Sequence, residues 1–256
     1  MYAVELKFRI ARRVSGDIQL QAIWSVLGLL RFNGNILGME FAPIPLGHYW
    51  FCRAFTPAKD SLQTKHYNEF LKKSLAELPK MGLRQPVAKV FGLIPESAER
   101  CFCRKHQAFY LSTNFLSVES PLRCFKCGGT SPLYEIPHHL SGQYGDVLTW
   151  QEDYKACDTL QMNCSTGERF ALREMTDVGS SLSVRGRNVC QQITNATGVP
   201  TYYDLFRYKS RTTISVERKR KCPQCRRQWI LKRPILRFDF KCDHCRLVST
   251  VSSTVT

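Results

Sequence analysis

Hydrophobic and polar positions alternate at the start of the chain and then change their period. Apolar side chains at every second position from Val4 to Ile10 predict a strand over residues 2–10 that buries one face. After Ser15, which can cap a helix, apolar residues recur at intervals of three and four up to about Arg31. This second pattern predicts an amphipathic helix packed against the first strand.

The same reading continues to about residue 95. Two short strands divided by the turn PIPLG, a second helix and a fourth strand are predicted at about residues 36–42, 48–55, 61–78 and from 87 onwards. The order β-α-β-β-α-β is that of a ferredoxin-like split unit. We therefore expect a ferredoxin-like α+β domain over residues 1–95.

Beyond residue 95 the spacing of the cysteines indicates metal-binding modules. Eight of the 12 cysteines form four close pairs. The N-terminus lacks the long apolar core of a secretory signal, and in a reducing compartment such pairs favour metal binding over disulfides. The four other cysteines are expected to be ordinary buried thiols: Cys52, Cys157, Cys164 and Cys190.

The last two pairs have the spacing of a four-cysteine zinc ribbon. Cys222 and Cys225 are separated by two residues, as are Cys242 and Cys245, and sixteen residues lie between the two pairs. Soft thiolates select zinc, and four of them leave no open position for a water or a substrate. A structural zinc ion is predicted here. Such an ion can contribute on the order of 10 kcal/mol of apparent folding free energy to a small module.

The first two pairs predict a second structural zinc ion. Cys124 and Cys127 form a regular knuckle, followed by a glycine that can adopt the left-handed conformation. The other pair, Cys101 and Cys103, is one residue tighter than usual. His106 is therefore an alternative ligand in place of one of these two.

Together these patterns predict an α+β chain of several modules. We expect a first zinc-ribbon module over 96–137, a helical segment over 138–205, a C-terminal zinc ribbon over 206–250 and a flexible tail over 251–256. Within the helical segment, apolar spacing and caps predict helices at about 144–164, 168–176 and 181–196.

Charge is concentrated in the C-terminal ribbon. The formal net charge of the chain is +16, of which residues 206–256, with 14 Lys+Arg against 3 Asp+Glu, contribute +11. A concentrated basic segment indicates an anionic partner. Phosphates would be bound by the cations near the knuckles, with an aromatic side chain that could stack bases. The residues predicted to bind nucleic acid are Arg218, Lys219, Arg220, Lys221, Arg226, Arg227, Trp229, Lys232 and Arg233.

Other features of this region have competing interpretations. Phe238 and Phe240 are expected to cover the ribbon's own small core, and the same holds as an alternative for Trp229. Arg207, Lys209 and Arg211 would share one face if they lay on a strand. Arg226 stands where ribbon knuckles usually have glycine, so a positive φ at this residue would cost roughly 1 kcal/mol.

Three stretches carry a resemblance to a known family. They are SPLRCFKCGGTSPLYEIP at 120–137, TGVPTYYDLFRY at 197–208, and the closing CPQCRRQW with FDFKCDHCRLVS. In these stretches the chain resembles a bacterial family of zinc-ribbon-containing, candidate nucleic-acid-binding proteins of unknown function. The resemblance implies a cytosolic bacterial protein with cysteine-ligated zinc, and it supplies no activity or catalytic residue.

The function expected from the sequence is therefore binding and not catalysis. No nucleotide-binding loop, nucleophile elbow or pair of catalytic carboxylates is recognisable, so we do not expect an enzyme. No apolar run is long enough to cross a bilayer, and a cytoplasmic protein without membrane contacts is expected. The predicted partner is DNA or RNA, bound without sequence specificity. The alternative is a nucleic-acid-associated protein complex bound by an adaptor with structural zinc ribbons.

Overall fold

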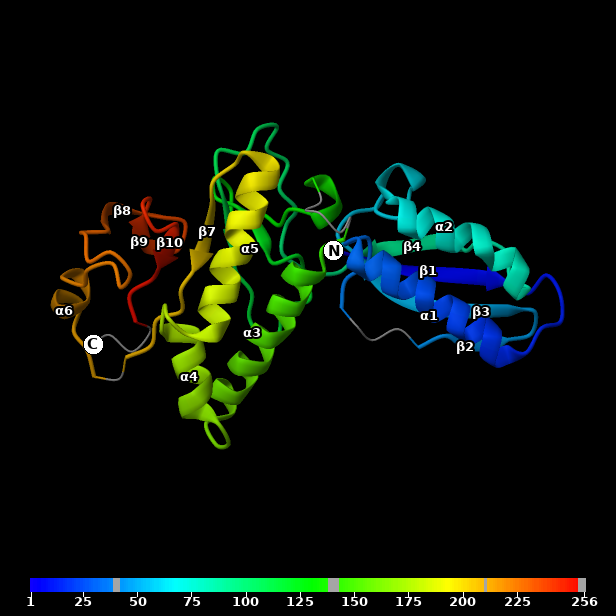
Figure 1. Cartoon of the computed structure of the whole chain (residues 1–256), viewed down its shortest axis with the longest axis horizontal. Helices are drawn as coiled ribbons and strands as arrows, with labels where there is room; N and C mark the ends of the chain where they lie inside the picture. The colour runs from blue at the N-terminus through cyan, green and yellow to red at the C-terminus, as the bar shows by residue number, and fades with distance from the viewer. Residues whose placement is uncertain (39–41, 138–142, 210, 253–256) are drawn as a thin grey trace. The chain divides into compact units, whose positions relative to one another are not determined.

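A computed structural model describes residues 1–38, 42–137, 143–209 and 211–252. The chain folds into two compact units (Figure 1). The first unit contains Met1–Arg100, Val118–Ser120 and Gly129–Gly145. The second unit contains Cys101–Ser117, Pro121–Gly128 and Asp146–Thr256. The structure is thus a mixed α+β fold with one sheet in each unit.

The first unit is built on an antiparallel sheet with the strand order β2-β3-β1-β4. The strands are β1 (Tyr2–Arg9), β2 (Ile44–Leu46), β3 (Tyr49–Thr56) and β4 (Val87–Leu93). The helices are α1 (Gly16–Phe32) and α2 (Glu69–Glu77), with 3-10 turns η1 (Thr64–His66), η2 (Leu78–Met81) and η3 (Leu133–Glu135).

Both helices of the first unit pack on one face of its sheet. The alternate residues Val4, Leu6 and Phe8 of β1 are at most 2% exposed, and they join a buried cluster with Leu27 of α1 and Leu71 of α2. The alternation predicted for the first strand is confirmed. Burial of this single apolar face is what fixes the register of β1 between β3 and β4.

The second strand lies outside its predicted position. Of the predicted strand 36–42, residues 39–41 are outside the described part of the chain, and residues 36–38 contribute one isolated bridge from Leu37. β2 instead occupies the PIPLG stretch that was predicted to be a turn, and the turn itself falls at Gly47, whose φ is 59°. Pro45 is tolerated because β2 is an edge strand, where a missing N–H interrupts no ladder.

The second helix also begins later than predicted. The pattern over 61–78 resolves into η1 and then α2, which starts at Glu69. Asn68 sets this start, since its side chain accepts a hydrogen bond of 2.9 Å from the Leu71 backbone N–H. Such a cap stabilises a helix N-terminus by about 1 kcal/mol.

The second unit is built on a mixed sheet with the strand order β6-β5-β7-β10-β9-β8. The strands are β5 (Phe109–Leu111), β6 (Leu122–Cys124), β7 (Thr201–Asp204), β8 (Ile230–Ile235), β9 (Phe238–Cys242) and β10 (Leu247–Ser249). β7 runs parallel to both of its neighbours, β5 and β10, whereas the remaining pairs are antiparallel. The two cysteine-rich segments therefore contribute strands to one continuous sheet.

The described part of this unit contains four helices, and the first residue of one of them, α3, belongs to the first unit. They are α3 (Gly145–Asn163), α4 (Glu168–Thr176), α5 (Ser181–Thr197) and the short α6 (Ile214–Arg218). The first three confirm the helices predicted within the middle segment. The Ser180 side chain caps α5 by accepting a hydrogen bond of 3.1 Å from the Ser183 N–H. None of the helices in the described parts of the chain is long and apolar enough to cross a membrane.

An aromatic cluster joins the two cysteine-rich segments in the interior of the second unit. Phe125, from the turn after β6, stacks on Phe238 of β9 with ring centroids 5.9 Å apart, and Tyr110 of β5 meets Phe238 edge-on at 5.1 Å. Tyr202 of β7 and Val248 of β10 complete the cluster, and all five residues are at most 7% exposed. Neither segment encloses a core of this size alone.

Hydrogen bonds hold Val251 and Ser252, the last two described residues, against the second unit. Residues 251–256 were predicted to be a flexible tail, and residues 253–256 lie outside the described part. The Val251 N–H donates to an Asp239 carboxylate oxygen at 2.9 Å. The Ser252 hydroxyl, 2% exposed, accepts from the Lys209 N–H at 2.9 Å.

Gly186 allows α5 to approach β7 and α3 closely. A Cβ at this position would lie 2.2 Å from the Tyr203 ring and 2.6 Å from the Trp150 indole nitrogen. We expect Gly186→Ala to destabilise the second unit by about 2–3 kcal/mol, since both rings are buried and cannot move aside. Calorimetry of the full chain would measure the change.

Gly28→Ala in α1 is the matched control, because nothing lies within 4 Å of its added Cβ. It should raise stability slightly, as alanine is favoured over glycine in a helix by up to about 1 kcal/mol. Equal effects of the two substitutions would contradict the packing argument.

Candidate metal centres

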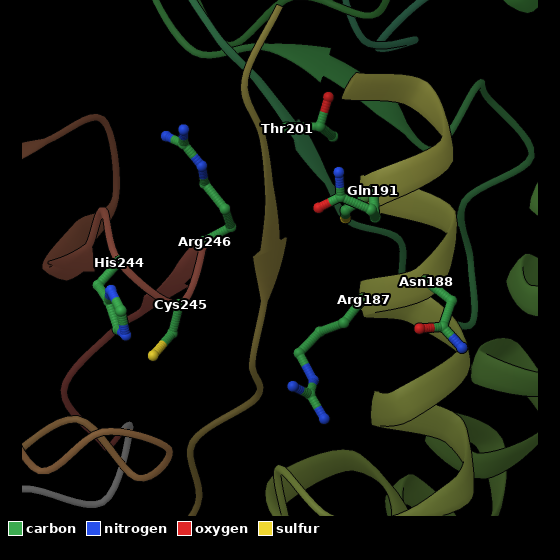
Figure 2. Close-up of a pocket in the computed structure, with 8 residues that line it drawn as sticks. Arg187, Asn188, Gln191, Thr201, His244, Cys245 and Arg246 are labelled. Atoms are coloured by element: carbon green, nitrogen blue, oxygen red, sulfur yellow. The ribbon is translucent and has the colours of Figure 1, made fainter. Parts of the chain in front are cut away.

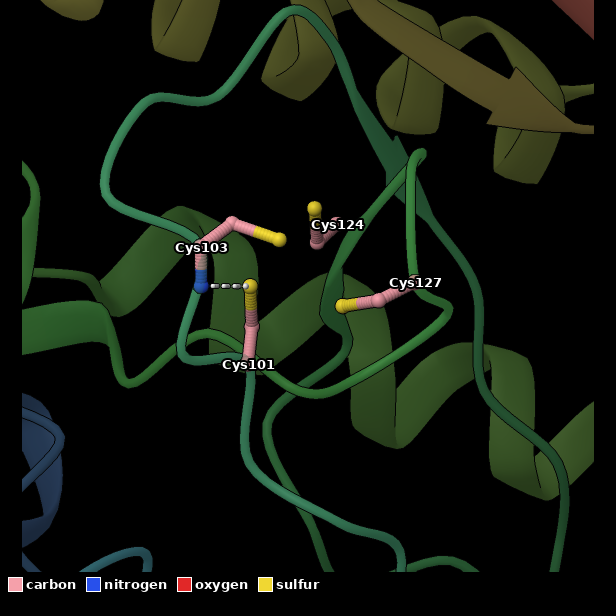
Figure 3. A group of neighbouring side chains, drawn as sticks. All are labelled: Cys101, Cys103, Cys124 and Cys127. Carbon is pink, nitrogen blue, oxygen red and sulfur yellow. Dashed lines mark hydrogen bonds between the residues drawn. The ribbon is translucent and has the colours of Figure 1, made fainter.

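The first centre gathers four cysteines from two loops of the second unit. Their sulfur atoms all lie within 4.8 Å of one another. Figure 3 shows Cys101 and Cys103 approaching from one chain segment, opposite Cys124 at the end of β6 and Cys127 in the turn that follows. The Cys103 N–H donates to the Cys101 sulfur at 3.3 Å, so the unusually tight pair still turns both thiols toward the other two.

His106 lies beside this centre but outside the group of four thiols. Its ring centroid is 4.5 Å from that of Phe109, its Nδ1 is buried without a hydrogen-bond partner among the described residues, and its imidazole lowers the pKa of the Cys124 thiol. Among the described residues, the group close enough to share one ion consists of the four cysteines. The arrangement gives His106 the position of an outer partner that orients a ligand, a role that tunes many metal sites.

The second centre has the same composition and is more regular. The sulfur atoms of Cys222, Cys225, Cys242 and Cys245 lie within 4.8 Å of one another, and those of Cys225 and Cys242 are 3.6 Å apart. Four sulfurs bound at 2.3 Å to a tetrahedral ion would be about 3.8 Å apart. The spacing of the thiols therefore suits a tetrahedral ion without rearrangement of the backbone.

Three of the four cysteine pairs share one turn geometry. The residue after the second cysteine has a positive φ in each: Gly128 at 76°, Arg226 at 63° and Arg246 at 53°. In the first two turns its N–H donates at 2.9 Å to the carbonyl oxygen of the first cysteine. The positive φ suggested for Arg226 from sequence is thus present, and glycine occupies this position only in the Cys124 turn.

Backbone N–H groups favour the thiolate form at one cysteine of each centre. Burial would raise the pKa of the Cys124 thiol, but hydrogen bonds from the Cys127 N–H and the His106 imidazole bring it to about 6. At Cys225 a hydrogen bond from the Arg227 N–H lowers the pKa to about 7. Burial raises the pKa of Cys245 and of Cys101, which is expected of closely packed thiols that need a cation to ionise together.

The remaining cysteines are separate from both centres. Cys52, Cys157 and Cys190 are buried as predicted, and burial raises the pKa of Cys52 to about 12. Cys164 is an exception to the prediction, because it is exposed. It follows the end of α3 with a φ of 50°, so it terminates the helix and does not continue its buried stripe.

Most cations predicted to bind nucleic acid lie on the surface around the second centre. Seven of the nine predicted residues are exposed cations, and none has an ion-pair partner among the residues that the structure describes. We call them the ribbon cations: Arg218, Lys219, Lys221, Arg226, Arg227, Lys232 and Arg233.

Trp229 and Arg220 differ from these seven because they form part of the interior. Trp229 is 2% exposed, packs on Phe240 at 5.1 Å and donates its indole N–H to the Arg220 carbonyl at 3.0 Å. The Arg220 guanidinium lies 4.9 Å from the Trp229 ring centroid and 4.2 Å from that of Phe240. The prediction that Trp229 stacks bases does not agree with this burial. Both residues hold the ribbon together.

A buried carboxylate explains where Arg207 and Arg220 point. Glu217 is 1% exposed, accepts a hydrogen bond of 3.0 Å from the Arg207 Nε and lies 3.6 Å from the Arg220 Nε. Although burial opposes it, the pKa of Glu217 is lowered because Arg207 hydrogen-bonds the ionised form. The strand suggested for residues 207–211 is absent from the described part of the chain, and Arg207 serves this interior contact.

Sequence reasoning missed the contacts that connect the two centres. Arg237, in the turn between β8 and β9, donates to Asp204 of β7 and to the Ser112 hydroxyl at 2.7 Å, while Ser112 donates to Asp204 at 2.8 Å. Phe238, whose burial was predicted, packs on Phe125 of the other segment. No local pattern indicates these partners, because Ser112 and Phe125 are more than 100 residues away in the chain and Asp204 is 33 residues away.

A polar cavity of about 250 Å³ lies beside the second centre. Figure 2 shows α5 on one side of it and the turn around Cys245 on the other. Arg187 of α5 and Arg246 both line the cavity, together with the His244 imidazole. The Arg187 Nε is buried without an acceptor, whereas an Arg187 Nη donates to the Val178 carbonyl at 3.1 Å. The lining offers donors to an anion.

Comparison with other proteins places the chain in a family. Three stretches match families described as domains of unknown function: residues 1–92 (DUF8589), 103–206 (DUF2310) and 211–255 (DUF8594). An uncharacterized protein of Haemophilus influenzae is 34% identical over 261 residues, which cover 98% of each chain. The chain belongs to this family of bacterial proteins of unknown function.

A second relative extends the same finding. Another uncharacterized protein of Haemophilus influenzae is 41% identical over 143 residues, which cover 56% of this chain and 70% of the relative. The expectation of a bacterial family of unknown function is confirmed, whereas the nucleic-acid binding implied by the resemblance stays a prediction.

The two centres predict how much metal the protein holds. We expect about two equivalents of divalent metal per chain, and Cys222→Ser or Cys124→Ser should each remove about one, because three thiols bind an ion far more weakly than four. Elemental analysis of anaerobically purified protein would measure both values.

Cys164→Ser is the control, since this exposed thiol belongs to neither centre. It should leave the metal content unchanged. Wild-type protein that is folded and holds less than about half an equivalent would contradict the assignment of both centres.

Proposed function

We propose that the protein is a zinc-stabilised nucleic-acid-binding protein whose C-terminal ribbon holds cations in a fixed array against a phosphate backbone. The observation that supports this most directly is the set of seven ribbon cations. They are exposed and have no ion-pair partner in the described structure. A polyanion can neutralise all of them at once, with release of its condensed counterions.

Zinc is the ion that suits both centres. Four thiolates form a soft, tetrahedral donor set, which excludes magnesium and calcium and favours zinc among the metals available in cells. All four positions are filled by protein, so each ion is structural. We infer a cytoplasmic location from the same chemistry, because free thiols at this density persist in a reducing compartment.

The fold assignments follow from strand order and from the turns. The order β2-β3-β1-β4, with both helices on one face, supports the ferredoxin-like assignment of the first unit. The turns with positive φ after Cys127, Cys225 and Cys245 support the assignment of both cysteine-rich segments as zinc ribbons.

The ribbon cations come from three neighbouring parts of the chain. They lie at the end of α6, in the Cys222–Cys225 turn and on β8. The zinc ion and the Trp229–Arg220–Phe240 stack fix these parts relative to one another, so the array is set before binding. Long cationic side chains that approach a backbone carry no base readout, and binding should be independent of sequence.

We do not propose an enzymatic activity, since a filled four-thiol site leaves no position for a substrate. The competing function is an adaptor that docks on an acidic protein surface. It would use the same cations, so experiments must separate the two. The salt dependence of nucleic-acid binding does so, because counterion release depends on the charge density of nucleic acid.

Removal of four ribbon cations should weaken binding and its salt dependence together. We expect the variant with Arg226→Gln, Arg227→Gln, Lys232→Gln and Arg233→Gln to bind a 20-base-pair duplex at least tenfold more weakly at about 100 mM salt. The slope of log affinity against log salt should fall in magnitude by about three to four, near 0.9 per lost phosphate contact. Fluorescence anisotropy at several salt concentrations measures both quantities.

A control variant removes the same charge elsewhere. Lys72→Gln, Lys73→Gln, Lys80→Gln and Arg84→Gln are all exposed positions of the first unit. This control should keep the wild-type slope. If both variants bind duplex like the wild type, the proposed nucleic-acid-binding function is wrong and the adaptor function is supported. The same conclusion follows if the wild type retains one protein and no nucleic acid after nuclease treatment.

Substitution of Arg226 should change the stability of the ribbon and its affinity for nucleic acid in opposite directions. Its φ of 63° costs an arginine roughly 1 kcal/mol that glycine would not incur. We expect Arg226→Gly to stabilise the ribbon by up to about 1 kcal/mol in urea unfolding and yet to weaken duplex binding severalfold. Arg227→Gly, which removes the same charge without relieving a positive φ, should weaken binding with no gain in stability. A gain in both stability and affinity for Arg226→Gly would remove this residue from the interface.

A further inference from the structure

The sheet of the first unit has an exposed face opposite its two helices. β1 and β3 alternate, so that Val4, Leu6 and Phe8 point to the helices and the residues between them point away. β4 pairs with β1 and places Lys89 opposite Glu5, with a register shift between Ala3 and Val4 that leaves Phe91 without a direct partner. Cross-strand register places Ile44 beside Phe51 and Leu46 beside Tyr49 on this outer face. We call this outer surface of the β2-β3-β1-β4 sheet the open face.

Aromatic side chains are concentrated on the open face. Tyr49 and Phe51 of β3 are partly exposed, with ring centroids 6.0 Å apart, and Phe55 continues the row at 38% exposure. On the edge strand β4, Phe91 is 54% exposed and lies next to Lys89, whose ammonium is 5.1 Å from its ring centroid. An isolated exposed aromatic residue needs no explanation, whereas four on one sheet surface indicate a binding site.

Cations are interleaved with these rings. The Lys7 ammonium lies 3.8 Å from the Tyr49 ring centroid and 5.3 Å from that of Phe51. Arg9 and Arg53 occupy further outward positions on β1 and β3, and Arg53 and Lys89 lie on either side of Glu5, the one carboxylate on the described strands of this face. None of the four cations has an ion-pair partner among the described residues. The open face therefore combines exposed rings with a net positive charge.

This combination favours one kind of occupant. A second copy of this chain, or any protein surface without matching carboxylates, would have to bury unpaired cationic side chains at a cost, and lysine is depleted at protein interfaces. A duplex hides its bases and offers nothing to stack on the rings. A single strand supplies bases for the rings and phosphates for the cations, as in the four-stranded sheets that recognise RNA through exposed aromatic residues. Lys7 is flexible enough to leave the Tyr49 ring for a phosphate when a base takes its place.

We propose that the open face binds single-stranded nucleic acid by stacking bases on Tyr49, Phe51 and Phe91 and pairing phosphates with Lys7, Arg53 and Lys89. This site shares no residue with the ribbon cations. The ribbon cations would bind the phosphate backbone of single-stranded or double-stranded nucleic acid, whereas the open face would bind a strand with unpaired bases. The two sites can be tested independently.

Phe91→Ala tests the stacking directly. We expect this substitution in the full chain to weaken binding of a labelled 20-nucleotide dT strand by about 5-fold or more, because each stacked base contributes that much. Binding of a 20-base-pair duplex should not change. Lys7→Gln with Arg53→Gln should lower the magnitude of the single-strand salt slope by about 0.7 per lost contact. Fluorescence anisotropy gives all of these values.

Phe70→Ala is a matched control, since Phe70 lies on α2 with the same 54% exposure as Phe91. It should bind both probes like the wild type. Because Phe91 is exposed on an edge strand, its truncation should leave the unfolding temperature nearly unchanged, and Lys7→Gln with Arg53→Gln provides a second variant that deletes no packed ring.

The outcomes distinguish the two surfaces. If the open-face variants bind the single strand like the wild type while the ribbon variant loses binding, this proposal is wrong and the ribbon assignment stands. The reverse result supports this proposal and removes the ribbon assignment. Wild-type protein that binds neither probe overturns both. Variants that change the sedimentation of the protein, and not its binding, identify the open face as a contact between copies and overturn the single-strand site.

Discussion

The second unit depends on a shortage of apolar side chains in each cysteine-rich segment. Neither segment can enclose a core alone, so each needs a crosslinking centre at its turns and a partner for its remaining rings. One sheet brings the two segments together: the four thiols of each centre are gathered where a bound ion could crosslink the turns, and the Phe125–Phe238 contact closes the interior. The family boundary between residues 206 and 211 crosses this sheet, since β7 on one side pairs with β10 on the other.

Buried carboxylates determine which cations remain available to a ligand. Glu217 fixes Arg207 and Arg220 in the interior, and Asp204 fixes Arg237 between the two centres. The second unit has few other acidic partners near the ribbon, so the ribbon cations stay exposed. The distinction between cations held by carboxylates and cations left exposed therefore follows from two acidic residues and not from the local density of basic ones.

The sequence predicted those features that depend on local spacing. The intervals between cysteines predicted which thiols group at each centre. The spacing of apolar residues and the capping serine predicted α5 to within one residue of its C-terminal end. Position-specific exceptions escaped the patterns: Pro45 is allowed in a strand only because that strand is an edge, and Arg220 lies against Trp229, Phe240 and Glu217 and not among the exposed cations. The burial of Trp229 agrees with the alternative that the sequence left open. The contact of Arg237 with Asp204 and Ser112 is set by tertiary structure alone, and no window of the sequence contains it.

The placement of β10 has a consequence for how the chain acquires its structure. This strand comes after the other described strands of its sheet in sequence, and yet it lies between β7 and β9. During synthesis the β7 edge and the rings of Tyr110 and Phe125 stay unpaired until the later strands of the sheet are made. An intermediate with an open edge is prone to associate with other chains. Early capture of zinc by the Cys101–Cys127 turns would shorten its exposure, and metal supply would then govern the yield of native protein.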